Sequence, residues 1–295
     1  MDKLYRVGDD VTMRFDDGAV TFCSNGGTLW PDWLEGTDIN RNEVISIRVS
    51  EGTVCLPKDA CGYNRRTDGF ALFGGLDKVQ RIDLKGFDTS HVKKMDSMFC
   101  GCVSLKELDL DGFDTSNVTD MNQMFWYCSS LTDLDLSGFD TSRVTDMHSL
   151  FWYCSSLKNL NLSSFDTSNV KDMRKMFYGC YSLTGLDVSN FNTSRVTNMR
   201  SMFEFCKELE YLDLSNFDTS NTTCMDGMFS RCFYLKELNM NGADMGKITS
   251  MRCMFSSCRN LKNIIMNPIV KNDTKTREIF RDCPAQLVGN YEEKP

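Results

Sequence analysis

The segment FDTSNVTDMNQMFWYCSSLTDLDLSG, residues 113–138, decides the fold, because the chain repeats it in a constant register. Phenylalanines, methionines and cysteines recur every 26 residues, and no insertion or deletion interrupts the spacing. The columns are Phe87, Phe113, Phe139, Phe165, Phe191 and Phe217 with Ala243 next, the methionines from Met95 to Met251, and the cysteines from Cys102 to Cys258. A fixed period over so long a stretch predicts a stack of similar units rather than one compact domain.

The second half of each unit predicts a short strand. In LTDLDLSGF, residues 131–139, Leu134 and Leu136 alternate with Asp133 and Asp135, which is the period of a strand with one buried face. Together with Leu131 they form the pattern L-x-x-L-x-L. A 26-residue period falls within the roughly 20–29 residues of leucine-rich repeats.

The first half of each unit predicts a short helix. In VTDMNQMFWYC, residues 118–128, Met121, Met124, Phe125 and Cys128 fall at positions i, i+3, i+4 and i+7. That spacing is typical of one apolar stripe along about two turns of helix. The preceding GFDTSNV supplies a glycine for a turn and polar side chains that can cap a helix.

Neither half can bury its apolar side chains alone, so neighbouring units have to stack. We therefore expect an α/β fold, a leucine-rich-repeat solenoid with a parallel concave sheet, short convex helices and a β-rich N-terminal cap. The cap is expected at residues 1–44, with a hairpin through the Asp-Gly of RFDDGAVTF, residues 14–22. The solenoid is expected at residues 45–267, with a degenerate first unit, the insertion PKDACGYNRRTDG and eight regular strands. A polar C-terminal cap is expected at residues 268–295.

Charge and composition exclude several partners. The chain has 33 Lys and Arg against 41 Asp and Glu, and its net charge of -8 repels nucleic acid. It has no run of about 18 apolar residues, so no membrane insertion is expected. Its first residues, MDKLYRVGDDVTMRF, lack the basic start and apolar stretch of a signal peptide, so a full-length chain of this sequence is expected in the cytoplasm.

The unit at residues 113–138 closely resembles the repeat of the BspA-like leucine-rich-repeat surface proteins of bacteria. The resemblance covers about residues 79–267, and PDWLE, residues 31–35, resembles the entry region of such proteins. It implies a binding or adhesion module, displayed on the cell surface or secreted, that recognises host proteins or other cells, and we expect a protein partner. A glycan-binding protein and an intracellular interaction or effector protein are the alternatives.

The cysteine column raises the question of disulfides. Each of its members replaces an apolar residue on the inner face of an expected helix, where a free cysteine behaves as a small hydrophobe. Packed helices lie about 8–10 Å apart, whereas a disulfide needs Cα atoms within about 6.8 Å, so the column is expected to stay reduced. Stacking at strand spacing would bring pairing nearer. The other cysteines show no zinc-ligand spacing, and we expect no metal and no cofactor.

One polar column on the expected strands is a candidate binding surface. Stacked carboxylates about 5 Å apart repel one another. The column therefore indicates solvated or hydrogen-bonded side chains, a surface for a cationic partner, or a bound cation. Its members on the expected concave face are Asp83, Asp109, Asp135, Asp187 and Asp213, with Asn161 and Asn239 interspersed.

The residue pattern does not favour an enzyme. The only histidines are His91 and His148, and no column combines a nucleophile with a base and an orienting group. The repeat itself multiplies the carboxylates, so their number says little about acid–base chemistry. We therefore expect no catalytic residue.

An aromatic patch is the second candidate binding surface. The two positions before the column cysteine are Trp126 and Tyr127 in one unit but Ser256 and Ser257 in another. On a helix these positions lie about 140 and 110 degrees from the apolar stripe, so the rings are expected to be largely exposed. Such a patch indicates either a binding site or ordinary packing between repeats, including a dimer contact. The aromatic patch consists of Trp126, Tyr127, Trp152, Tyr153, Tyr178, Tyr181 and Phe205.

Overall fold

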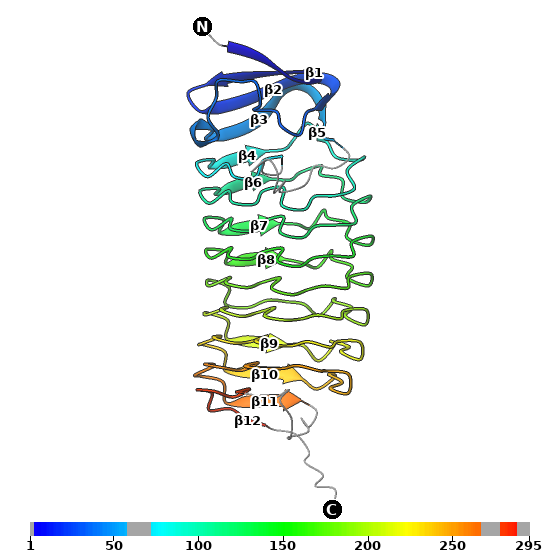
Figure 1. Ribbon diagram of the computed structural model, residues 1–295, viewed down its shortest axis with the longest axis vertical. Coiled ribbons are helices and arrows are strands. Elements are labelled where there is room, and N and C mark those ends of the chain that lie inside the picture. Colours follow the sequence, from blue (N-terminus) through cyan, green and yellow to red (C-terminus); the bar gives the residue numbers. More distant parts are fainter. Residues whose placement is uncertain (1–2, 58–71, 267–277, 288–295) are drawn as a thin grey trace, which may run out of the picture.

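The computed structural model describes residues 3–57, 72–266 and 278–287. Figure 1 shows a long stack of rungs, with strands β1 to β3 at one end and β12 at the other. Most rungs cross one face as a short strand, and we call this face the sheet face. Each rung then returns along the opposite face, which we call the turn face. The elements are β1 (Lys3–Asp16), β2 (Ala19–Leu29), 3-10 helix η1 (Arg41–Glu43), β3 (Ser46–Cys55), β4 (Arg81–Asp83), β5 (Phe87–Asp88), β6 (Glu107–Asp109), β7 (Asp133–Asp135), β8 (Asn159–Asn161), β9 (Tyr211–Asp213), β10 (Glu237–Met240), β11 (Asn263–Met266) and β12 (Gln286–Leu287).

The N-terminal cap is built on a hairpin. Strands β1 and β2 pair in antiparallel fashion, and Asp16 lies opposite Ala19. The two loop residues, Asp17 and Gly18, both have positive φ, as a tight hairpin turn of the primed type requires. The predicted Asp-Gly hairpin is thus confirmed. Strand β2 then pairs parallel with β3, and β3 pairs parallel with β4, so the sheet runs from the cap into the solenoid.

The sheet face follows the predicted alternation. In β7, Leu134 is buried between the exposed Asp133 and Asp135, and it lies in register with Leu160 of the parallel strand β8. The unit that starts at Leu183 differs, because residues 184–188 form no strand, so the expectation of eight regular strands is wrong for this unit. Gly185 takes a strand position there, and a glycine weakens a strand because it has no side chain to pack.

The predicted convex helices are not formed. Among the described residues the structure assigns only η1 as helical, and η1 lies in the cap. On the turn face, alternate backbone N–H groups donate to the next rung: Gln123 donates to His148 O over 3.0 Å and Phe125 to Leu150 O over 3.0 Å. The intervening N–H groups return three residues, as in the 3.0 Å bond from Trp126 to Gln123 O. The turn face is therefore a second ladder of bonds between rungs.

Left-handed residues explain why this half of the unit cannot be helical. Gln123 and Tyr127 have φ of 57° and 60°, and the equivalent Ser149 and Tyr153 have 57° and 58°. An α-helix of L-residues requires right-handed dihedrals throughout. The left-handed residues, four positions apart, change the direction of the chain and end each short turn. The side chains at 121, 124, 125 and 128 are nevertheless buried, as they would be in a helix.

The core consists of columns of identical side chains. The rings of Phe125, Phe151 and Phe177 stack with centroids 5.6 Å apart at each step. This spacing is near the roughly 4.8 Å between strands and well below that of packed helices. A second stack contains Phe113 and Phe139, at 6.0 Å.

The cysteine column lies in the same core. All fourteen cysteines of the chain except Cys61, which lies outside the described residues, are free thiols. The column was expected to stay reduced because packed helices would hold its cysteines too far apart. That reason is wrong, because the rungs stack at strand spacing and not at helix spacing. Instead each column thiol has a fixed partner: the Sγ–H of Cys128 donates to Phe99 O over 3.2 Å.

A buried threonine column joins the rungs at the corner after each sheet strand. Thr115 is 1% exposed; its hydroxyl donates to Asp140 O over 2.9 Å and accepts the Asp140 N–H over 2.8 Å. The buried hydroxyl of Thr115 and both backbone groups of Asp140 are thereby satisfied, as buried polar groups require.

The described part of the predicted C-terminal cap continues the stack. Phe280 stacks on Phe255 at 5.3 Å, and β12 pairs parallel with β11. The remainder of the predicted cap and residues 58–69 of the insertion lie outside the described residues.

Candidate binding sites

The aromatic patch forms one connected array on the turn face. Trp126 and Trp152 lie 5.1 Å apart between ring centroids, and Tyr127 and Tyr153 stack at 4.9 Å with an interplanar angle of 11°. Tyr153 continues the contacts to Tyr181 at 5.7 Å. Tyr178 and Phe205 follow in the next rungs, with their centroids 5.5 Å apart. The structure thus brings together all seven rings that the sequence singled out.

The exposure of these rings differs from the prediction. Tyr127 is 37% exposed, and the other six rings are half-buried. The expectation of largely exposed rings is wrong for those six, because it rested on helical angles. At strand spacing each ring covers part of the next one.

Cations lie over the rings. Lys175 Nζ is 5.1 Å from the Trp152 centroid, Lys207 Nζ is 3.9 Å from that of Tyr181, and Arg231 Cζ is 4.7 Å from that of Phe205. Such contacts are attractive because the face of an aromatic ring is negative. The array therefore has a basic edge on an acidic chain.

Two polar groups inside the patch are costly. The indole Nε1 atoms of Trp126 and Trp152 are buried, and neither has a hydrogen-bond partner among the described residues. A buried unpaired donor costs about 1–3 kcal/mol. The scaffold does not demand these rings, since Ser230 and Ser256 stand in the same column.

Burial also shifts the pKa of one acid beside the patch and of one tyrosine within it. It raises the pKa of Glu204, whose carboxylate lies 3.8 Å from Arg231, and raises the pKa of Tyr178 to about 12, with the charge of Glu204 adding to the effect.

The predicted acidic column lies on the sheet face, and one oxygen of each carboxylate has a structural partner. Asp135 Oδ1 accepts the Ser137 N–H over 2.9 Å, and Asp187 Oδ1 accepts the Ser189 N–H over 3.0 Å. These bonds close a turn where the chain leaves the sheet face. They also lower the pKa of Asp135 and of Asp187. The same Oδ1 bond to the N–H two residues later is made by Asp83, Asp109, Asn161, Asp213 and Asn239.

A trio of possible metal ligands occurs on the turn face, where the sequence predicted no metal. Atoms of Asp146, His148 and Asp172 lie within 4.8 Å of one another. His148 Nδ1 lies 2.8 Å from Asp146 Oδ1, and Arg174 Nε lies 3.3 Å from Asp172 Oδ2. Burial raises the pKa of Asp172, and the charge of Asp146 adds to the rise. Arg174 thus already supplies a positive charge where a metal would bind.

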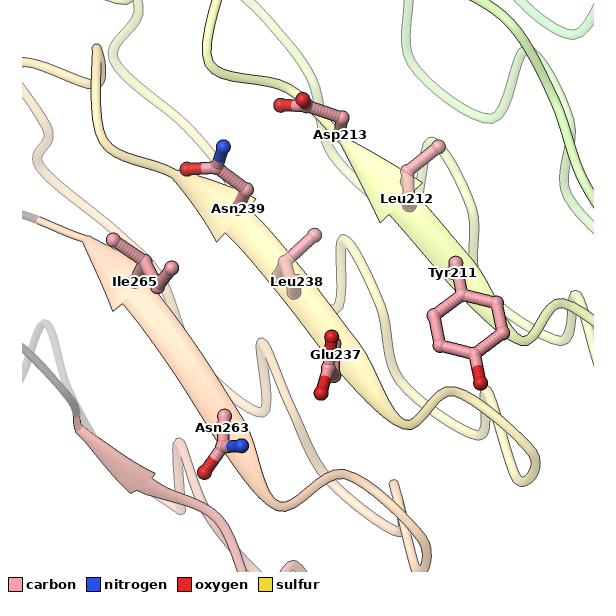
Figure 2. A pocket seen from close by; sticks show the side chains of 8 residues that line it. All are labelled: Tyr211, Leu212, Asp213, Glu237, Leu238, Asn239, Asn263 and Ile265. Atoms are coloured by element: carbon pink, nitrogen blue, oxygen red, sulfur yellow. The ribbon is translucent and has the colours of Figure 1, made fainter.

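A hollow of about 440 Å³ on the sheet face was missed by the sequence reasoning, except for Asp213. Figure 2 shows its lining on three parallel strands, with Tyr211, Glu237 and Asn263 in one row across them, Asp213, Asn239 and Ile265 in another, and two leucines between the rows. The lining residues are Tyr211, Leu212 and Asp213 of β9, Glu237, Leu238 and Asn239 of β10, and Asn263 and Ile265 of β11. The repeat copies also differ here, because Tyr211 and Ile265 take positions where other units have glycine, asparagine or a charged residue. This difference was the signal available in the sequence.

The chain is distantly similar to several solved leucine-rich-repeat structures. The chain is similar to a leucine-rich-repeat protein of T. pallidum, at 16% identity over 83% of each chain and a TM-score of 0.34. It is also similar to a leucine-rich cell surface protein of Faecalibacterium prausnitzii, at 15% identity over 99% of this chain and 96% of that one, with a TM-score of 0.30. A leucine-rich-repeat protein of Leptospira interrogans is 13% identical over 84% of this chain and 68% of that one, with a TM-score of 0.31. At these scores the likenesses carry nothing on function.

No curated protein matches the chain. In the part of the chain that the structure describes, no helix has the length and apolarity of a membrane span. The family described as "Mycoplasma protein of unknown function, DUF285" matches residues 68–186 and again residues 172–290, and these two segments together take in most of the solenoid. With these matches and its BspA-like 26-residue repeats, the chain belongs to the DUF285 family of leucine-rich-repeat proteins.

Proposed function

We propose that this chain is a non-enzymatic binding module that holds a protein partner on the aromatic patch. The observation that carries the proposal is the continuous ring array over four consecutive rungs. In the two columns before the column cysteine, rungs outside the patch have cysteine, glycine, serine or arginine. Tyrosine and tryptophan dominate the hot spots of protein interfaces. The scaffold accepts serine in the same columns, at Ser230, Ser256 and Ser257, so the fold does not require aromatic rings there.

The edge of the patch defines the chemistry of the partner. Lys175, Lys207 and Arg231 lie over rings of the patch, so the complementary surface is apolar at its centre and carries carboxylates at its rim. The acidic column on the sheet face is the alternative contact. There, the second carboxylate oxygens of Asp109 and Asp135 are free of the turn bonds that hold Oδ1, and they suit a cationic partner.

The proposed location is the bacterial cell surface, where a binding module of this kind acts in adhesion. This location rests on the resemblance to BspA-like surface proteins, and the intracellular interaction protein remains the alternative. Detection of the protein on intact cells with an antibody, before and after external protease treatment, distinguishes the two locations.

The function is tested by screening the chain against an array of purified extracellular proteins and then measuring binding of the double variant Tyr127→Ser, Tyr153→Ser. Serine is tolerated in this column, because Ser257 occupies it with φ of 61°. Loss of a hot-spot ring costs about 2 kcal/mol or more, roughly 30-fold in Kd. Tyr234→Ser, which removes a 48% exposed ring outside the patch, is the control. Unchanged binding of the double variant contradicts the proposal.

A further inference from the structure

We propose that the hollow on strands β9, β10 and β11 binds an uncharged pyranose unit of a glycan. The site lies on the sheet face, is separate from the aromatic patch on the turn face, and does not depend on the proposed protein partner. Its volume of about 440 Å³ falls in the roughly 300–1,000 Å³ range of small-molecule sites.

A single ring supplies the platform for stacking. Tyr211 is 54% exposed, and Figure 2, which looks onto the strands, shows its ring face-on. The neighbouring rung has Gly185 at the equivalent position, where Glu210 N–H bonds to Thr184 O and so sets the two rungs side by side. A Cβ added at Gly185 would meet nothing within 4 Å, so the space on the side of the ring away from β10 is open as well. The C–H groups on one face of a pyranose need such an open, flat, apolar surface.

Beside the ring, one acceptor and one donor are held in fixed positions. Asp213 and Asn239 are paired in register on β9 and β10. Asp213 Oδ1 accepts the Ser215 N–H over 2.9 Å, and Asn239 Oδ1 accepts the Asn241 N–H over 3.2 Å. These bonds fix both side chains and leave a carboxylate oxygen next to an amide Nδ2. Two vicinal hydroxyls match this pair, because a hydroxyl both donates and accepts.

A second acceptor and donor complete the row that contains the ring. Glu237 is in register with Tyr211 on one side and with Asn263 on the other. Both Glu237 and Asn263 are exposed, and Figure 2 shows them in line with the ring across the three strands. At the position equivalent to Tyr211, other rungs have Glu107, Asp133 or Asn159, so this register position carries an aromatic ring only at Tyr211.

The charges around the hollow favour a neutral ligand. The carboxylates of Asp213 and Glu237 repel an anionic sugar. Lys236 Nζ, which Glu210 holds at 2.7 Å, lies 5.4 Å from the Tyr211 ring and repels a cationic side chain from it. The N–H groups of the two amides would find no acceptor in a purely cationic ligand, because such a ligand offers donors alone. A polyhydroxylated, uncharged ring uses all four polar groups.

The test is saturation-transfer NMR of the intact chain with a panel of methyl pyranosides and neutral disaccharides. We expect at least one of them to bind, and Tyr211→Asn and Asn239→Asp each to weaken its Kd at least tenfold. Both substitutions install a residue that the same column already holds elsewhere, at Asn159 and Asp213. The matched control is Asn161→Asp, which makes the identical change in the same column outside the hollow and should leave binding unchanged.

Other outcomes overturn the proposal. It fails if no neutral pyranoside or disaccharide binds, if Tyr211→Asn and Asn239→Asp both retain full affinity, or if an arginine-rich peptide binds in the hollow in preference to every neutral sugar. Thermal melting checks the fold of each variant, and Asn239→Asp decides alone if Tyr211→Asn does not fold. The variant Tyr127→Ser, Tyr153→Ser should keep sugar binding, so failure of the protein-binding proposal is distinguishable from failure of this one.

Discussion

The thiol of Cys154 donates a hydrogen bond to the main-chain carbonyl of Phe125 in the preceding rung, over 3.1 Å. The same bond recurs along the whole cysteine column, always to the phenylalanine 29 residues earlier. A weak donor is thus repeated once per rung inside a dry core. The pairs are Cys102–Phe73, Cys128–Phe99, Cys154–Phe125, Cys180–Phe151, Cys206–Phe177, Cys232–Phe203 and Cys258–Phe229.

This arrangement predicts that alkaline pH destabilises the fold. Burial raises the pKa of the Cys154 thiol from 9.0, and raises that of Cys206 to about 12. Above pH 9 the unfolded chain therefore releases thiol protons that the folded chain keeps, and stability falls with rising pH until the folded pKa is passed. Each buried thiol contributes up to about 1.4 kcal/mol per pH unit. Urea unfolding at pH 8 to 11 should show a shallower slope for Cys154→Ala than for the parent, and equal slopes contradict the assignment.

Gln123 distinguishes the turn face from a helix. Its φ of 57° is left-handed, where glycine carries no steric penalty and an L-residue pays about 1–2 kcal/mol. We expect Gln123→Gly to be more stable than Gln123→Ala by about 1 kcal/mol in chemical denaturation. In a helix the order would be reversed by a similar amount, so a more stable alanine variant would restore the helical interpretation.

The strand half of the unit could be predicted from the sequence, and the other half could not. The alternation of Leu134 and Leu136 with aspartates has a period of two, which few structures other than a strand produce. The spacing of Met121, Met124, Phe125 and Cys128 also fits a helix, but turns with a left-handed residue at every fourth position bury the same positions.

A signal for the left-handed positions was present. Gly101, Gly179 and Gly227 occur in the two columns that have positive φ, at 75°, 73° and 62°. Glycine is the residue that takes such dihedrals most readily, and glycines recurring in fixed columns argue against a helix. Most members of these columns are serine, lysine or aromatic residues, which do not by themselves indicate a positive φ, so the pattern of glycines was easy to miss.

The binding surfaces were predicted unevenly. Disagreement between copies identified Trp126 and Tyr127, but the helical interpretation gave these rings the wrong exposure. The same criterion, applied to the strand rows, would have identified Tyr211 and Ile265. The sequence does not show the open space beside Tyr211, because that space depends on how the rung with Gly185 lies next to β9.

The phenylalanine stack should dominate stability. Phe151 is fully buried and lies between Phe125 and Phe177 at 5.6 Å from each. Phe151→Ala leaves a cavity that the neighbouring rings cannot move in to fill, because each is held in its own rung. We therefore expect a loss of about 3–5 kcal/mol in the free energy of unfolding. Phe151→Leu, which keeps most of the volume, should lose much less. A loss below about 1 kcal/mol for the alanine variant would show that the stack is not core.

The threonine column offers a test of buried hydrogen bonding. Thr115→Val keeps the shape of the side chain but leaves the N–H and C=O of Asp140 without the hydroxyl. An unsatisfied buried backbone group costs about 1–3 kcal/mol, so we expect a loss of at least 1 kcal/mol in urea unfolding. Thr115→Ser retains the hydroxyl and should keep most of the stability. Equal stability of the valine and serine variants would mean that water replaces the bonds.

The aromatic patch should contribute to stability as well as to binding, and the two contributions are separable by residue. Trp126 and Trp152 are half-buried and contact each other and Tyr127. Because aromatic pairs are worth about 0.5–1.5 kcal/mol each beyond their buried area, we expect Trp126→Ser, Trp152→Ser to lower Tm and also to weaken partner binding.

Tyr127→Ser removes the most exposed ring of the patch and should weaken binding with a smaller change in Tm. Thermal melting and partner titration of the same preparations measure both effects. If Trp126→Ser, Trp152→Ser melts like the parent, the ring contacts do not stabilise the stack. If Tyr127→Ser and the double tryptophan variant both bind the partner with parental affinity, the rings are packing alone, and the binding surface has to be sought on the sheet face around Asp109, Asp135, Asp187 and Asp213.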